Sequence, residues 1–203
     1  MIANPSFDVL RNLPGVFHVA DLTVRLGWKP RLAQKRLYLW SCCGVISAMD
    51  RHSGVYANLI GSRYPDWEIG LRMVMPSAVV SGLEVLRRAG WITQIPYLIT
   101  VTVSAAQRVH KVDRFTVNVQ APEWFDAAET GIRSGEGVAL PSLAPAWALA
   151  DLVKQEGWCE CGIGPDDIYW DAITIADECD WENACAAFHL GKLSMNPSSA
   201  PNV

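Results

Sequence analysis

The 203-residue chain has no apolar segment that could cross a membrane and comparatively few charged residues, 19% of the total. Its longest uncharged run, residues 89–107, contains Pro96 and alternates at period two near its end, which is typical of a strand. Residues 1–15 carry Asp8 and Arg11 without an apolar stretch of the secretory kind, so we expect no signal peptide and no membrane association. Because 50% of the residues are hydrophobic, the composition predicts a packed core and excludes a disordered chain.

The 6 cysteines include no Cys-x-x-Cys pair of the metal-binding or redox kind. Cys42 and Cys43 are adjacent, and adjacent cysteines make poor structural disulfides. We therefore expect reduced thiols and a cytoplasmic location. A zinc site can be drawn from four residues: Cys159, Cys161, Cys185 and His189. The Cys-x-Cys spacing is unusual for zinc, so ordinary buried thiols are the simpler interpretation and no metal is assigned.

Sequence motifs of the common enzyme classes are missing as well. The chain has no P-loop, no dinucleotide-binding glycine fingerprint and no nucleophile elbow. A nuclease of the restriction type usually carries an acidic residue two positions before a lysine, and Lys111, Lys154 and Lys192 have none. We therefore predict that the protein is not an enzyme and has no catalytic residue and no cofactor.

The alternative is a metal- or nucleotide-binding enzyme whose acidic C-terminal domain carries the activity. The acidic side chains of residues 166–182 are the candidates for a metal cluster in such an enzyme. Helix capping and a solvated acidic surface explain the same side chains more simply.

The charge of the chain is divided unevenly along its length. Residues 1–64 contain eight basic and three acidic side chains, a net charge of +5, whereas the remainder contains nine basic and eighteen acidic ones, a net charge of −9. A basic N-terminal third indicates a polyanionic partner such as DNA. The alternative is chance asymmetry between two ordinary surfaces.

The basic third has the pattern of a winged helix-turn-helix. Its apolar spacing and turn residues predict helices over residues 7–13, 17–26 and 30–43 and strands over residues 45–49 and 55–57. A tight turn over residues 50–54 joins the two strands into a hairpin. In this arrangement the third helix enters the major groove of DNA and the hairpin, or wing, lies along the phosphates.

The candidate DNA-binding residues lie on the third helix and on the wing. They are Lys29, Arg31, Gln34, Lys35 and Tyr38 on or just before the helix, and Arg51 and His52 at the wing. The helical members recur at positions i, i+3, i+4 and i+7, and their side chains are of the kind that contacts phosphates and base edges. An ordinary solvated helix face, or a winged helix used only for protein contacts, is the competing interpretation.

Residues 65–195 are expected to form a larger mixed α/β domain with a small sheet, which makes the whole chain α+β. The predicted elements are helices at 67–75, 77–90 (capped by Ser77, with Val79 buried), 145–157 and 181–190 (capped by Asp180), a helix start at 164–167, and strands at 99–103 and 115–119. The two strands are predicted to pair across a turn at residues 109–113. The tail, residues 196–203, is expected to be disordered.

Three blocks of the sequence resemble the AbiEi-type antitoxins. They are residues 14–22 (PGVFHVADL), followed by the basic helix and a wing ending at residues 53–56, then residues 78–96, and then residues 143–151. A helix-turn-helix alone is a weak marker of a family, but the order of all three blocks is more specific.

The resemblance implies a bacterial two-domain regulator of a type IV toxin–antitoxin or phage-defence system. Such proteins repress their own operon by binding promoter DNA, and their C-terminal half counters a nucleotidyltransferase-like toxin without forming a stable complex. By this resemblance Arg31, Gln34, Lys35 and Tyr38 match the recognition helix and Arg51 the wing tip. We expect two copies on an inverted repeat, while the sequence leaves the state of the free protein open. The acidic C-terminal half departs from the pattern and argues against a second nucleic-acid surface there.

Overall fold

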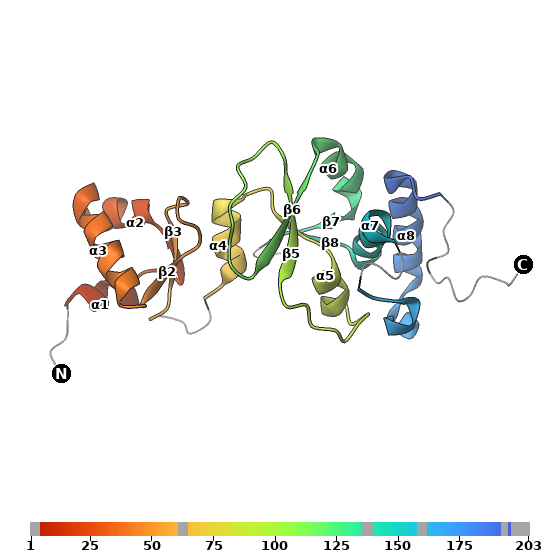
Figure 1. Cartoon of the computed structure of the whole chain (residues 1–203), viewed down its shortest axis with the longest axis horizontal. Coiled ribbons are helices and arrows are strands. Elements are labelled where there is room, and N and C mark those ends of the chain that lie inside the picture. The colour runs from red at the N-terminus through yellow and green to blue at the C-terminus, as the bar shows by residue number, and fades with distance from the viewer. Residues whose placement is uncertain (1–4, 61–64, 135–139, 158–161, 192–194, 196–203) are drawn as a thin grey trace, which may run out of the picture. The chain divides into compact units, whose positions relative to one another are not determined.

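The computed structural model describes residues 5–60, 65–134, 140–157, 162–191 and 195, which form eight α-helices, three short 3-10 turns and two sheets. This confirms the predicted α+β class. The chain divides into two compact units (Figure 1), one of Met1–Pro76 with His110–Asp113 and the other of Ser77–Val109 with Arg114–Val203. None of the described helices is long and apolar enough to cross a membrane. The predicted disordered tail lies outside the described residues.

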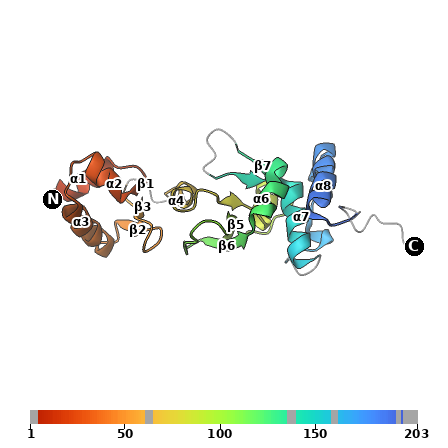
Figure 2. The ribbon, with the colours of Figure 1, turned by 90° about the horizontal axis from the view of Figure 1, so that it is seen from above.

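The first unit has the element order and sheet of a winged helix. Its elements are α1 (Pro5–Arg11), β1 (Val16–His18), α2 (Val19–Val24), α3 (Pro30–Cys42), β2 (Ile46–Ala48), β3 (Val55–Asn58) and α4 (Trp67–Val74). The three strands form an antiparallel sheet in the order β1-β3-β2, with the β2–β3 hairpin as the wing (Figure 2). The side chains of Leu10, Phe17, Leu22, Leu37 and Trp40 form the core between the helices and the sheet.

The prediction of a helix over residues 17–26 is wrong at its first residues, which belong to strand β1 in the structure. Phe17 pairs with Tyr56 of β3, and the helix begins only at Val19. His18 is the residue at which the chain changes direction. Its Nδ1 accepts a hydrogen bond from the Ala20 amide at 3.1 Å, while its own amide donates to Oδ2 of Asp21 at 2.9 Å. This reciprocal capping box fixes the start of α2.

The side chain of Asn58 is fully buried and connects the end of β3 to the end of α1. Its Nδ2 donates to the carbonyl oxygen of Leu10 at 2.6 Å and lies 3.4 Å and 3.5 Å from the carbonyl oxygens of Leu13 and Pro14. Its Oδ1 accepts a hydrogen bond from the Ile60 amide at 3.1 Å. One carboxamide therefore adds a buried donor at the Leu10 carbonyl, which also accepts from the Leu13 amide at 3.2 Å, and holds the chain after β3 through the Ile60 amide.

The first unit is larger than the predicted domain of residues 1–64, because α4 belongs to it. The predicted helix at 67–75 is present, and it packs on β3 and β1. Gly70 makes this approach possible, since a Cβ there would lie 2.6 Å from Cε of Met49. The boundary thus falls at Pro76, beyond the polar connection that the sequence indicated.

The second unit contains a mixed five-stranded sheet and four helices. Its elements are β4 (Val79–Val80), α5 (Leu83–Arg88), β5 (Ile99–Ser104), β6 (Phe115–Gln120), α6 (Pro122–Ala128), β7 (Ile132–Arg133), β8 (Ser142–Leu143), α7 (Pro145–Glu156) and α8 (Ile175–Phe188). The strand order is β6-β5-β4-β8-β7, with β5 parallel to β6, β4 parallel to β8, and antiparallel pairing elsewhere. Trp147 of α7 packs edge-on against Phe188 of α8.

Several predicted elements of the second unit are corrected by the structure. Strands β5 and β6 are parallel, so they do not form the expected hairpin. Val79 lies in β4 opposite Thr102, and the helix begins after Gly82, whose φ of 69° breaks the regular backbone. The last helix begins at Ile175, capped by the Thr174 hydroxyl, and Asp180 lies inside it. The helix start at residues 164–167 is a single 3-10 turn, whereas the helix opened by Pro145 is confirmed.

Replacing Asn58 by alanine is expected to destabilise the first unit by about 2 kcal/mol, because the substitution removes a buried donor to the Leu10 carbonyl and the acceptor of the Ile60 amide. Urea unfolding followed at the amides of β1 and β3 by NMR measures the change. Asn12→Ala is the matched control, since that side chain makes one exposed hydrogen bond, to the Asp8 carbonyl. Equal effects of the two substitutions would contradict a connecting role for Asn58.

Candidate nucleic-acid interface

The face of α3 that the sequence singled out is exposed. Ala33, Leu37 and Trp40 are buried on the opposite side of the helix, with exposed fractions of 0%, 4% and 2%. Four of the predicted residues are exposed together on the outer face, Arg31, Gln34, Lys35 and Tyr38, and Lys29 is the exposed residue at the N-cap. The structure therefore brings four of the five predicted residues to one face of this helix, and it exposes Lys29 at the N-terminal end.

Two exposed leucines also belong to this face and were not predicted. Leu32 and Leu39 are each 42% exposed, and at 100° per residue they border the Arg31–Lys35 row on the side opposite Gln34. Their seven-residue spacing is the signal that could have found them, but leucine at helical spacing is more often a core residue. On this surface they are apolar groups beside the polar side chains.

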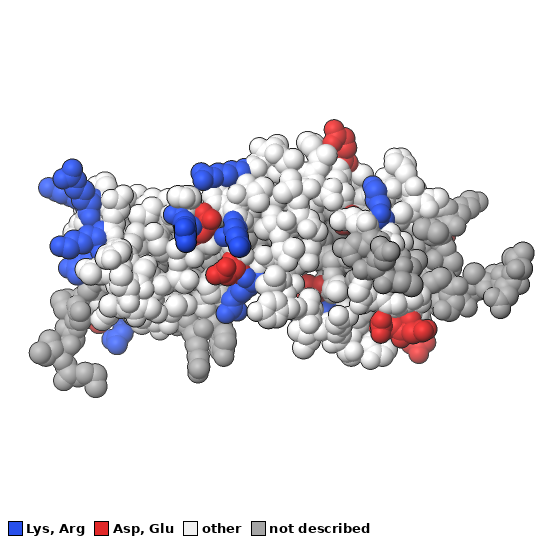
Figure 3. Space-filling model, in the orientation of Figure 1, with Lys and Arg blue, Asp and Glu red and all other residues white. Residues whose placement is uncertain are grey.

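The stretch of sequence that contains α3 is free of acidic residues. No Asp or Glu occurs between Asp21 and Asp50, and α3 itself carries Arg31, Lys35 and Arg36. In the described part of the chain no ion pair involves these three side chains. Figure 3 shows Lys and Arg side chains, drawn in blue, gathered over the end of the first unit that α3 occupies. The positive charge of this face is therefore available to an anionic partner.

Tyr38 is the most exposed aromatic side chain of α3, at 69%. Its hydroxyl lies beside the thiol of Cys42 one helical turn later, and their hydrogen bond raises the pKa of Tyr38 above its ordinary value. Because the ordinary pKa of tyrosine is already about 10, the phenol carries no negative charge next to Lys35 at neutral pH and can donate a hydrogen bond.

The wing turn is organised by Asp50. Its Oδ1 accepts a hydrogen bond from the His52 amide at 2.8 Å, and its carbonyl oxygen accepts one from the Ser53 hydroxyl at 3.2 Å. Gly54 then returns the chain with a φ of 68°, close to the ring of His18. The turn leaves the predicted wing residues Arg51 and His52 exposed at its tip.

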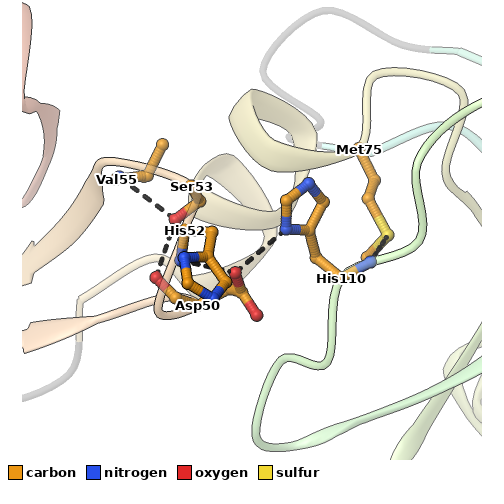
Figure 4. A network of polar contacts seen from close by, with 6 residues as sticks. All are labelled: Asp50, His52, Ser53, Val55, Met75 and His110. Atoms are coloured by element: carbon orange, nitrogen blue, oxygen red, sulfur yellow. Dashed lines mark hydrogen bonds and ion pairs between the residues drawn. The ribbon is translucent and has the colours of Figure 1, made fainter.

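His110, which is distant in sequence, contacts the wing, and no sequence pattern predicted this contact. His110 belongs to the first unit, and its Nδ1 lies 3.0 Å from Oδ1 of Asp50 (Figure 4). Its amide donates to the sulfur of Met75 at 3.5 Å. The contact with His110, followed by the hydrogen bond from the His52 amide, lowers the pKa of Asp50. The one carboxylate of the wing is therefore held by the His52 amide and His110, and its role is structural.

The acidic second unit is where the alternative, a metal- or nucleotide-binding enzyme, would have its site. Among the described residues, no group of three His, Cys, Asp or Glu side chains is placed to hold a metal ion. One pocket, of about 180 Å³, is lined by Ile92, Thr93, Gln94, Asp166, Asp167 and Tyr169. This is below the roughly 300–1,000 Å³ of ordinary small-molecule sites.

The buried carboxyl group of the second unit is held by its neighbours. Asp151 accepts hydrogen bonds from Nε1 of Trp124 at 2.8 Å and from Nε2 of Gln155 at 2.7 Å. Burial raises the pKa of Asp151. Through these contacts Asp151 joins α7 to Trp124 of α6.

The zinc site drawn from the sequence is only partly within the described residues. Cys159 and Cys161 lie outside them. Cys185 is buried in α8, and burial raises the pKa of its thiol, which disfavours the thiolate that a zinc site requires. His189 ends the same helix in the left-handed conformation, with a φ of 60°.

Comparisons of the chain with protein-family models and with curated proteins found no match. Among solved structures, the chain is similar to the RV2827C protein from Mycobacterium tuberculosis, with a TM-score of 0.55 and 18% sequence identity. The similarity covers 75% of this chain, and the chain spans 60% of the length of that protein. At this identity the similarity concerns the fold alone, so the resemblance to AbiEi-type antitoxins stays a prediction.

Replacing Asp50 by alanine is expected to destabilise the first unit by about 1 to 2 kcal/mol at neutral pH, because two hydrogen bonds of the wing are lost. A lowered carboxyl pKa stabilises the fold at pH values above the ordinary carboxyl pKa, which is near 4. This stabilisation is lost as the pH falls through the lowered pKa. Unfolding of the wild type should therefore become easier below about pH 4, more steeply than that of Asp50→Ala.

Urea unfolding at neutral pH and between about pH 3 and pH 5 measures this difference. Asp8→Ala is the control, because Asp8 forms only an exposed ion pair with Arg11, at 3.4 Å. Identical acid sensitivity of the wild type and Asp50→Ala would refute the role of Asp50.

Proposed function

We propose that the protein is a sequence-specific binder of double-stranded DNA that acts as a transcriptional repressor. The observation that carries the proposal is the exposed, acid-free face of α3 on a winged-helix unit. A helix of this kind fits the major groove, and an adjacent hairpin with Arg51 at its tip fits the phosphate backbone or the minor groove. A solvated helix face without this function has no need to exclude acids over the whole stretch from Asp21 to Asp50.

Some side chains of the α3 face suit phosphate contacts, which position a protein on DNA, and others suit recognition of base edges. Arg31 and Lys35 suit phosphates and the O6 and N7 atoms of guanine, and Gln34 suits the N6 and N7 atoms of adenine. Tyr38, protonated at neutral pH, donates to the backbone. Leu32 and Leu39 suit the methyl groups of thymine. The operator is therefore expected to depend on both charge and base identity.

We infer from the resemblance to AbiEi-type antitoxins that the operator lies in the promoter of the chain's own gene, as an inverted repeat bound by two copies. Such an autoregulator acts in the bacterial cytoplasm. The same resemblance is the support for a role of the second unit against a nucleotidyltransferase-like toxin, without a stable complex. The modest interface of a single winged helix favours two copies on the operator.

Binding of the full chain to its upstream DNA is expected to weaken as salt rises, with a slope of log K against log salt of about −0.9 per phosphate neutralised. Arg31→Ala and Lys35→Ala should each weaken binding about tenfold or more, because each removes a cation from the α3 face. If Lys35 contacts a phosphate, its removal should also reduce the salt slope by about 1. Fluorescence anisotropy against upstream and scrambled DNA at several salt concentrations measures these effects.

Arg108→Ala is the matched control, since Arg108 is an exposed arginine of the second unit. Circular dichroism establishes that each variant is folded. Retention of wild-type affinity by both Arg31→Ala and Lys35→Ala would overturn the assignment of the interface. Equal and weak binding of the wild type to both DNAs would overturn the proposed function.

A further inference from the structure

The two edges of the sheet in the second unit differ in how they are protected. One edge is β7, which has only two residues and carries the charged Arg133. The other is β6, which has six residues and the sequence FTVNVQ, without a charge or a proline. Natural sheets usually protect an edge by shortness, charge, proline or a bulge, and β6 has none of these. A long uncharged edge of this kind is typical of a strand that pairs with another chain.

The free side of β6 carries backbone groups without partners. The Ile99 amide donates to the carbonyl oxygen of Arg114, and the Ala105 amide to that of Gln120, so the even-numbered residues of β6 face β5. In a parallel pair the alternate residues face away from the neighbour. In the described part of the chain, no hydrogen bond reaches the amides and carbonyl groups of Phe115, Val117 and Val119.

An apolar side chain at this edge is also left uncovered on the core face of the sheet. Val119 is opposite Val103 of β5, and their side chains lie on the same face. Val103 is 0% exposed, whereas Val119 is 49% exposed. Phe115, on the same face at the start of β6, is only 7% exposed, so this face is covered at that end and open at Val119, where a further strand beside β6 would complete the covering.

We propose that β6 pairs with β6 of a second copy of this chain, antiparallel and centred on Val117. In that register Val117 is opposite its own counterpart and Val119 is opposite the partner's Phe115, and each such pair exchanges two hydrogen bonds. Apolar side chains then meet apolar ones, and Thr116 meets the partner's Asn118 on the polar face.

The charges at the two ends of the strand suit the same pairing. Lys111, Asp113 and Arg114 precede β6 with a net charge of +1 and Glu123 follows it, so antiparallel pairing brings ends of opposite net charge together. A parallel arrangement of two copies would bring like charges together. The partner that the strand fits is therefore itself, in a twofold-symmetric dimer.

The test uses the full chain without DNA, so that its result is independent of the proposed function. Sedimentation equilibrium should detect a dimer that dissociates on dilution. Val119→Lys should raise the dimer Kd at least tenfold, because the lysine would be placed against the partner's Phe115. Val109→Lys is the matched control, since Val109 is a comparably exposed valine, at 45%, outside β6. It should leave the dimer unchanged.

Hydrogen exchange of the wild type provides a second measurement that needs no variant. The amides of Phe115, Val117 and Val119 should gain protection as the protein concentration rises, whereas those of Thr116 and Asn118 are protected at every concentration. A wild type that is monomeric at high concentration would overturn the proposal. So would a dimer that Val119→Lys leaves intact, or protection of the three outward amides that does not change with concentration.

Discussion

The first unit depends on one buried carboxamide, that of Asn58. The sheet is held to the helices at this point, because the same side chain binds the carbonyl of Leu10 at the end of α1 and the amide of Ile60 after β3. The close packing of the core already resists sliding of the helices on the sheet, and these hydrogen bonds add a directional constraint at one point. The orientation of α3 follows, because its buried residues Leu37 and Trp40 pack into the core that α1 and β1 close.

Much of the fold and the candidate surface could be predicted from local patterns. The three helices and hairpin of the first unit, and the exposed face of α3, follow from apolar spacing and turn residues that act within a few positions. What could not be predicted depends on distant pairing. The local pattern places Val79 and Val80 in a helix. They form a strand because they pair with Thr102 and Val101, which are distant in sequence. The contact of His110 with Asp50 joins residues 60 positions apart, and no local pattern carries that information.

The wing shows how one acidic residue is accommodated on a surface that is otherwise basic. Asp50 is needed for the turn, and its carboxylate is directed to the His52 amide and to His110. Its charge is partly balanced by these donors, so the adjacent Arg51 keeps an open tip. The most buried acidic groups of the second unit are held in the same way: Glu84 accepts hydrogen bonds from Arg87 and Arg88, and Asp151 from Trp124 and Gln155.

Because His110–Asp113 belong to the first unit, recombination cannot separate the two units of this chain at a single point. Val112, which is buried, and His110 follow β5 in the chain yet belong to the first unit, so that unit is encoded in two separate stretches. A gene fusion that transfers only the first stretch leaves part of that unit behind. Exchange of intact modules, the usual route by which regulators acquire new effector domains, is therefore closed to a single crossover in this chain.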